Sequence, residues 1–504
     1  MRRASPFLLL TACGLIAASA GCRSKDSGTE TASRRTSDSA DASAERGEEV
    51  AITTASDEAR KLYIRGRALS EQLRTHDARK LFEQAAAKDP TFALVHYDLA
   101  IISPTPKESF AHMNEAVKLS SKASEGERLM IQALQAGANN DSKSSLEYIE
   151  ELAAKYPRDA RVQSLLGFTY SNQQEFDKAV SELTEATKLD PSYSPAYNAL
   201  GYAYMSLGKY ADAEAAFKKY IELVPNDPNP YDSYAEMLMR TGRFDESIVQ
   251  YRKALSVDPH FTGSYIGIAS NLMFQGKYAP AAAQAQRLYD EARDDGDRRT
   301  AMLSRTVIYV DQGRTAQAMR EMEKLYGLDA RLGDTVAMSA DAAQMGDILL
   351  GAGRPDEAGK RYRQSLDLIQ RSGLPGELKD NTKLADHYNL ARVALAKADT
   401  AQAKAHAQQY MSGAEATQDV GRIRLGHELA GTIALRERDF DEAVNELGQA
   451  DQQDPYILYT MATAYQGKGD AANAKEFAKR AADMHILPTI RYALVRTKAM
   501  KMVG

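Results

Sequence analysis

The chain has 504 residues, with 64 Lys and Arg against 69 Asp and Glu and a formal net charge of −5 at pH 7. This balance argues against nucleic acid as a main partner, because phosphate binding needs a concentrated positive field. Apolar residues recur mostly with a helical period, and the alternating β-branched runs typical of strands are missing. We therefore expect an all-α chain.

The first 21 residues have the pattern of a bacterial signal peptide. Two arginines precede an apolar run over residues 6–18, which is too short to span a bilayer. The run leads to Ser19-Ala20-Gly21-Cys22, which resembles the lipobox of bacterial lipoproteins, where the cysteine becomes lipid-modified. Leu10-Thr11-Ala12-Cys13 is a second candidate with a very short leader, and plain secretion or a retained leader is a third possibility. We expect lipidation at Cys22.

The only two cysteines lie in this leader region, so the folded part can hold neither a disulfide nor a cysteine-based metal site. Residues 22–56 follow, and Val50 and Ile52 are the only large aliphatic residues among them. Such a segment cannot bury enough apolar surface to offset the entropy of ordering it. We expect a disordered tether that reaches about 30 Å.

An internal repeat occupies the centre of the chain. Pro157, Pro191, Pro225 and Pro259 follow one another at equal intervals of about 34 residues, a spacing typical of solenoids. Aligning the units on these prolines brings further columns into register. They are Leu166, Leu200, Tyr234, Ile268; Gly167, Gly201, Ala235, Ala269; Gly208, Gly242, Gly276; and Phe176, Tyr210, Phe244, Tyr278.

Each column has a physical reason. Large apolar residues three and four apart build one helix face, and Gly or Ala where two helices cross lets them approach closely. Glycines such as Gly208 end the first helix of a unit in a left-handed cap. Proline at the unit end, as at Pro225, cannot continue the second helix and starts the turn into the next unit.

These columns resemble the tetratricopeptide repeat family, most closely over residues 160–288, with weaker copies along most of the remaining chain. The resemblance implies a solenoid of about twelve helix-turn-helix repeats coiled into a right-handed superhelix. We expect a regular array at 57–295, a degenerate array at 296–487 and a capping helix at 488–504. Residues 327–336 and 371–381 interrupt the period and are expected to bend or break the second array.

No pattern in the sequence predicts a catalytic site, a metal site or a cofactor. His427-Glu428 resembles half of a zinc-protease motif, but Gly431 stands where the second histidine should be. Phosphate-binding loops and nucleophile elbows are missing from the sequence. We therefore expect a protein that is not an enzyme.

In tetratricopeptide arrays, one stripe of the first helix of each repeat lines a concave groove that binds segments of partner proteins. Apolar and methionine side chains on such a face suit an adaptable interface, unless superhelical curvature buries them against neighbouring repeats. Transferred by position, the resemblance implies a partner-binding groove formed by Phe168, Asn198, Tyr202, Met205, Asp232, Glu236, Met239 and Met273.

These observations predict a scaffold in the cell envelope. It would be anchored by its lipid on the outer side of the cytoplasmic membrane, or on an outer membrane facing the periplasm, and would position proteins of an envelope complex. One alternative is a solenoid that binds a small molecule or glycan in the same groove. Another is an enzyme with an unrecognised site in the irregular half.

Overall fold

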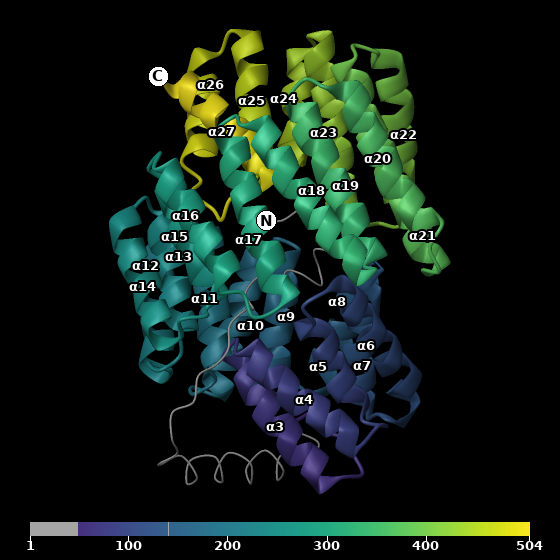
Figure 1. Ribbon diagram of the computed structural model, residues 1–504, viewed down its shortest axis with the longest axis vertical. Helices are drawn as coiled ribbons and strands as arrows, with labels where there is room; N and C mark the ends of the chain where they lie inside the picture. Colours follow the sequence, from purple (N-terminus) through teal and green to yellow (C-terminus); the bar gives the residue numbers. More distant parts are fainter. Residues whose placement is uncertain (1–48, 140) are drawn as a thin grey trace.

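The computed structural model describes residues 49–139 and 141–504, and within them the chain forms 25 α-helices and no strand. Helices α3 to α26 form twelve consecutive antiparallel pairs (Figure 1). The first array contains seven pairs: α3 (Asp57–Glu71) with α4 (Thr75–Lys88), α5 (Ala93–Ile102) with α6 (Pro106–Leu119), α7 (Glu125–Ala138) with α8 (Ser142–Lys155), α9 (Ala160–Asn172) with α10 (Phe176–Leu189), α11 (Ser194–Ser206) with α12 (Tyr210–Leu223), α13 (Asn229–Arg240) with α14 (Phe244–Val257), and α15 (Thr262–Phe274) with α16 (Tyr278–Asp290).

The second array contains the other five pairs and is followed by a single last helix, α27 (Ile490–Val503). Its pairs are α17 (Asp295–Asp311) with α18 (Thr315–Leu332), α19 (Thr335–Gly351) with α20 (Pro355–Gln370), α21 (Gly376–Ala396) with α22 (Thr400–Ala416), α23 (Val420–Glu437) with α24 (Phe440–Gln449), and α25 (Pro455–Lys468) with α26 (Ala471–Ala482).

The turn inside each central repeat has the geometry that its glycine predicts. Gly208 has φ 72°, its N–H donates to the carbonyl of Met205, and the N–H of Lys209 donates to the carbonyl of Tyr204. Gly201 fills the helix-crossing position, where an added Cβ would lie 2.6 Å from the ring of Phe217. The expected left-handed cap and close helix approach are both confirmed.

The expected interruptions of the second array are absorbed by longer helices. Residues 327–332 extend α18, which ends at Gly333 in a left-handed conformation, and α21 begins at Gly376 and runs for 21 residues. Helices α17 to α23 have 16–21 residues, against 10–15 in the first array. The prediction of a bend or break at these two segments was wrong, because insertions of a few residues add helical turns without opening the packing.

Repeats far apart in sequence also touch, so the array is less extended than contact between neighbours alone would make it. Lys107 at the start of α6 donates its N–H to Asp334 over 3.1 Å, and its ammonium bonds the carbonyl of Leu332. Further polar contacts between the arrays, over 2.6–2.8 Å, join Asn139 to Glu377 and Asn381, Lys143 to Gln418, and Gln174 to Asp451.

An apolar cluster also lies between the two arrays. Phe110 and Met113 of α6 pack with Val336 of α19, Ile369 of α20 and Leu378 of α21, and all five are buried. Apolar burial of this kind is the main favourable term in association between surfaces. The superhelix therefore closes on itself and encloses its inner face.

Helix α27 does more than cap the last repeat, which corrects the expectation for residues 488–504. It packs on α25 and α26 but also on α17 and α19, the first helices of two earlier repeats. Arg496 makes a bidentate ion pair with Asp311 of α17 over 2.6 and 2.7 Å, with both side chains buried. Its guanidinium also lies over the ring of Phe274 in the first array.

The end of the predicted tether belongs to the folded body. The N–H groups of Val50, Thr53 and Ala55 donate to Asp159, Glu127 and Asp89, carboxylates of three different repeats. Val50 and Ile52 pack into the hydrophobic clusters of the first array. The tether boundary at residue 56 was therefore too late. The leader, Cys13, Cys22 and the rest of the tether lie outside the described residues.

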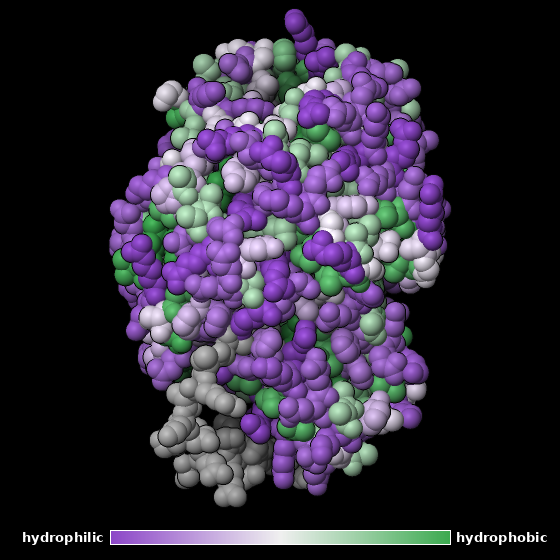
Figure 2. Space-filling view, viewed as in Figure 1, coloured by the Kyte–Doolittle hydropathy of each residue, from purple (hydrophilic) through white to green (hydrophobic). Residues whose placement is uncertain are grey.

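The outer surface is predominantly polar. Figure 2 shows hydrophilic residues over most of one face, with hydrophobic residues in scattered spots. Among the described residues, the large hydrophobic side chains that are exposed are Tyr210, Val249, Val420 and Met500, which lie on four different helices. Within the same residues, none of the helices is long and apolar enough to cross a membrane. The inner face of the superhelix is therefore the candidate binding surface.

Candidate functional site

The closed superhelix contains an interior chamber with a volume of about 520 Å³. Its wall comes mainly from the first helices of the repeats, α11, α13 and α15 of the first array and α17, α19, α21, α23 and α25 of the second. Parts of α4 and α6 and the segment leading into α27 complete the wall. Small-molecule sites in proteins have volumes of about 300–1,000 Å³, so the chamber has the size of a ligand site.

One side of the chamber is acidic. We name this surface the acidic wall: Tyr202 of α11, with Asp232 and Glu236 of α13. The Tyr202 hydroxyl donates to Glu236 over 2.9 Å, and the hydroxyl of Ser264 donates to Asp232 over 2.6 Å. Asp232 and Glu236 are one helical turn apart and therefore face the chamber together.

Burial is the main cause of the titration behaviour of the acidic wall. It raises the pKa of Asp232 to about 7. The hydrogen bond from Ser264 lowers this pKa, and the negative charge of Glu236 raises it. Burial and the Glu236 carboxylate likewise raise the pKa of Tyr202 well above its usual range. Asp232 therefore exchanges its proton near neutral pH, and a cation placed beside it would favour the charged form.

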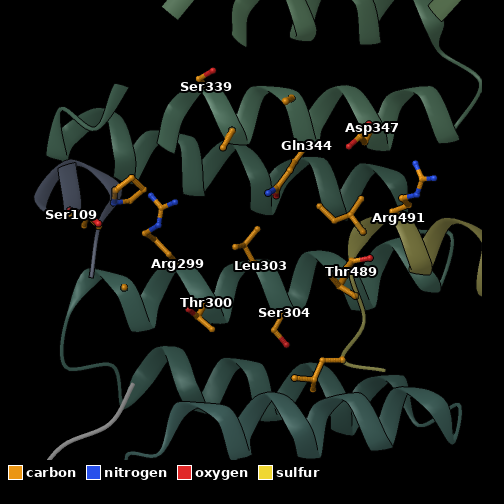
Figure 3. Close-up of a pocket in the computed structure, with 18 of the residues that line it drawn as sticks. Ser109, Arg299, Thr300, Leu303, Ser304, Ser339, Gln344, Asp347, Thr489 and Arg491 are labelled. Atoms are coloured by element: carbon orange, nitrogen blue, oxygen red, sulfur yellow. The ribbon is translucent and has the colours of Figure 1, made fainter. Parts of the chain in front are cut away.

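The part of the chamber that the second array lines carries uncharged polar groups. We name it the neutral wall: Thr300 and Ser304 of α17, Gln344 of α19 and Asn389 of α21. Figure 3 shows Gln344 pointing from its helix toward Leu303, with Thr300 and Ser304 on the other flank of α17. Within the described part of the chain, these four side chains form no hydrogen bond to protein, and the Gln344 Oε1 atom is buried.

Two arginines of the chamber are neutralised by ion pairs within the protein. Arg491 bonds Glu428 over 2.6 Å and Asp454 over 2.5 Å, and its guanidinium lies 3.9 Å from the centre of the Tyr456 ring. Arg299 pairs with the buried Asp329. These pairs order the wall and reduce the net field that a ligand meets.

The three methionines among the candidate groove residues are buried, which corrects their assignment to an exposed face. Met205 packs with Phe217, Met237 and Leu238 of its own and the next repeat. Met239 and Met273 belong to the large cluster that includes Ile490, Tyr492 and Val495 of α27. All three methionines are therefore part of the hydrophobic core, and two of them share a cluster with residues of the C-terminal helix.

The remaining candidates lie in different places. Tyr202, Asp232 and Glu236 meet in the acidic wall, as described. Phe168 and Asn198 are half-buried on α9 and α11 and are not among the described residues that line the chamber. His427 bonds the carboxylate of Glu446 over 2.8 Å. Glu428 bonds Arg491 and Tyr388, so this dipeptide has a structural role in the fold.

The sequence analysis did not predict the residues of the neutral wall. The glycine turns after two of its helices could have indicated that these helices face the interior. Gly313 of repeat 8 and Gly353 of repeat 9 are aligned with Gly208. Counting back from them to the four motif positions of the inner stripe gives eight residues. Six of these line the chamber: Thr300, Leu303, Val307, Ala340, Ala343 and Asp347. The sequence analysis assigned this stripe only in the repeats of residues 160–288.

Comparisons with known proteins agree with this architecture. Residues 169–228 and 229–261 match family models described as tetratricopeptide repeat. No curated protein matches the chain. Residues 169–261 therefore contain tetratricopeptide repeats, and the twelve helix pairs form an all-α solenoid consistent with that fold. Tetratricopeptide repeat proteins generally mediate protein–protein interactions, and their fold is typically non-enzymatic.

Several solved structures resemble parts of the chain. A tetratricopeptide repeat protein from Parabacteroides merdae is 17% identical, with 54% of this chain and 94% of that chain covered and a TM-score of 0.35. TTC0263, a thermophilic TPR protein in Thermus thermophilus, is 24% identical, with coverages of 42% and 98% and a TM-score of 0.27. YrrB, described as having an unusual peptide-binding site, is 17% identical, with coverages of 37% and 94% and a TM-score of 0.25.

Proposed function

We propose that this protein is a non-enzymatic, lipid-anchored scaffold of the bacterial cell envelope that binds a segment of a partner protein in its chamber. The observation that carries the proposal is the acidic wall, where inner-face side chains of successive repeats meet in an enclosed space. The polar outer surface supports it, because it leaves the interior as the best-formed binding surface.

The acidic wall favours a partner segment with an apolar residue followed by Lys or Arg. The carboxylates of Asp232 and Glu236 offer charge to a cation, and the nearby Ile266 and Phe261 side chains offer apolar contact in the same chamber. A charge-assisted hydrogen bond to a partly buried carboxylate is stronger than a neutral one. One basic side chain reaching this wall would therefore contribute strongly to recognition.

The experiment that tests the proposal compares Asp232→Asn with the wild type in partner capture from solubilised membranes. Asparagine keeps the acceptor oxygen for Ser264 but removes the charge, so we expect capture to weaken about tenfold. Asp290→Asn removes one charge from an exposed position at the end of α16 and should leave capture unchanged. Equal capture by all three proteins would contradict the proposal.

Capture should also depend on pH in a predictable direction. A basic segment prefers the ionised Asp232, whose pKa is about 7 in the free protein, so affinity should rise as pH increases from about 6 to about 8. The dependence should be lost in Asp232→Asn. Binding that weakens over the same range would exclude a cationic segment at this wall.

Tyr202 requires a milder substitution than alanine. Its ring packs edge-on against Phe217 at 5.3 Å, an aromatic contact worth about 0.5–1.5 kcal/mol beyond area burial. Tyr202→Ala would therefore disturb both folding and binding. Tyr202→Phe keeps the ring and removes only the hydroxyl that bonds Glu236, so it tests the wall with the core intact.

Anchoring is proposed at Cys22, which lies outside the described residues. A single acyl chain gives only marginal membrane binding, so stable anchoring would require more than one chain on the modified cysteine. Cys22→Ser should abolish incorporation of a radiolabelled or clickable fatty acid and release the protein from membranes. Persistent labelling that disappears only in Cys13→Ser would move the site to Cys13.

A further inference from the structure

The neutral wall is built as a hydrogen-bonding surface that the protein itself does not use. Within the described residues, Thr300, Ser304, Gln344 and Asn389 face the chamber and bond no protein group. Buried polar groups in native proteins are usually paired, so an orphan such as Gln344 Oε1 needs an explanation. A bound molecule that supplies the missing hydrogen-bond donors and acceptors would explain these unpaired groups.

The surroundings of the neutral wall indicate the charge of that molecule. Arg299 and Arg491, the labelled arginines nearest to it in Figure 3, are paired with Asp329 and with Glu428 and Asp454. Asp347 pairs with Arg392 over 2.7 Å and accepts a hydrogen bond from Tyr362. A charged ligand would have to compete with these pairs, and an anion would also meet the carboxyl group of Asp386, which lines the chamber. An uncharged ligand faces neither cost.

The shape and polarity of the chamber indicate the chemical class of the bound molecule. Hydroxyl and amide groups from three helices alternate with apolar side chains, among them Leu303, Val307 and Leu487. Sugars and polyols present the matching surface, with many hydroxyls in a ring or chain that also has apolar C–H faces. A site of about 520 Å³ is large enough to surround such a molecule.

We propose that the neutral wall binds a small, uncharged, hydroxyl-rich molecule, of the size of a mono- or disaccharide or a cyclic polyol. Thr300 and Ser304 would exchange hydrogen bonds with its hydroxyls, and the Gln344 and Asn389 amides would supply one donor and one acceptor each. The neutral wall and the acidic wall line the same chamber but share no residue, so this proposal does not depend on the proposed partner segment.

The test is isothermal titration calorimetry of the folded protein with glucose, galactose, N-acetylglucosamine, sucrose and myo-inositol, and with glucosamine and glucuronate as charged counterparts. At least one neutral compound should bind, and more tightly than either charged compound. Gln344→Leu should weaken that binding about tenfold, the loss expected for a hydrogen bond to a buried group. It should not lower the melting temperature, because the amide oxygen has no partner in the protein.

Matched variants keep the result specific. Gln408→Leu, at an exposed position of α22, should bind like the wild type. If Gln344→Leu melts early, Ser304→Ala provides the same comparison with a smaller change. Asp232→Asn should leave sugar binding unchanged, so failure here and failure of the partner proposal can be told apart.

Two results would overturn the proposal. One is that none of the neutral compounds binds, or that the charged ones bind more tightly. The other is that Gln344→Leu and Ser304→Ala both bind as the wild type does. Binding of an uncharged tripeptide, such as Ala-Ser-Ala acetylated at its N-terminus and amidated at its C-terminus, in the absence of any sugar binding would assign the wall to main-chain recognition and would also overturn it.

Discussion

The two arrays share one repeat plan but reach it differently. The first array has helices of 10–15 residues, and its central repeats take glycine at the left-handed turn position. The second has helices of up to 21 residues, and Ala398 and Arg438 take that conformation in two of its repeats. A regular sequence pattern therefore identifies the repeats with short helices. The repeats with long helices pack in the same way, but their sequence pattern is weaker.

The two arrays also contribute different walls to the chamber. The first array supplies the acidic wall and the second supplies the neutral wall, and α27 lies against both arrays. The contacts at α6 and α27 help to hold the two arrays together around the chamber. The following substitutions test how strongly each contact does so.

The largest effect is expected at the buried ion pair of α27. Arg496→Ala leaves Asp311 buried without its cation, which should cost about 3–5 kcal/mol of unfolding free energy. Urea unfolding followed by circular dichroism measures it. Arg243→Ala removes an exposed pair with Glu246 and should cost less than about 1 kcal/mol. Equal costs would mean that α27 is only loosely attached.

The apolar contact between the arrays should be the next most sensitive. Leu378→Ala removes a buried side chain from the cluster shared by α6 and α21, at a cost of about 2–5 kcal/mol. Small-angle scattering should then show a larger radius of gyration, because the arrays separate. Leu152→Ala, equally buried within the first array, should lower stability without changing the overall dimensions.

A smaller cost is expected where two helices of one repeat cross. Gly201→Ala places a methyl group 2.6 Å from the ring of Phe217, so the ring or the helix must shift, at a cost of about 1–3 kcal/mol. The melting temperature should fall while helicity at low temperature is kept. An unchanged melting temperature would show that the crossing is loosely packed.

The smallest effects are expected at the left-handed turns, where the sign should depend on whether the turn residue is glycine; both arrays contain turns of each kind. Gly208→Ala meets no atom within 4 Å but must hold φ near 72°, so it should lose about 1 kcal/mol. Ala398→Gly relieves a φ of 62° and should gain about 0.5–1 kcal/mol. Thermal melts of both variants check the pair, and a shared sign would contradict this account.

The sequence by itself determined the repeat. The proline spacing, the apolar columns and the glycine turns predicted an all-α solenoid and about twelve helix pairs, and the structure confirms both. Asp232, Glu236 and Tyr202 were also placed on the inner face by their motif positions. These features follow from contacts within one or two repeats, which local periodicity encodes.

Only the tertiary structure decided what the inner face became. Superhelical closure brings Phe110 and Leu378 into one apolar cluster. Met239 and Met273 share a buried cluster with residues of α27, although the sequence analysis placed them on an open groove. Whether such residues meet depends on small rotations between repeats, which add up along the chain and leave no local pattern. The chamber and its two walls are a result of that accumulated curvature.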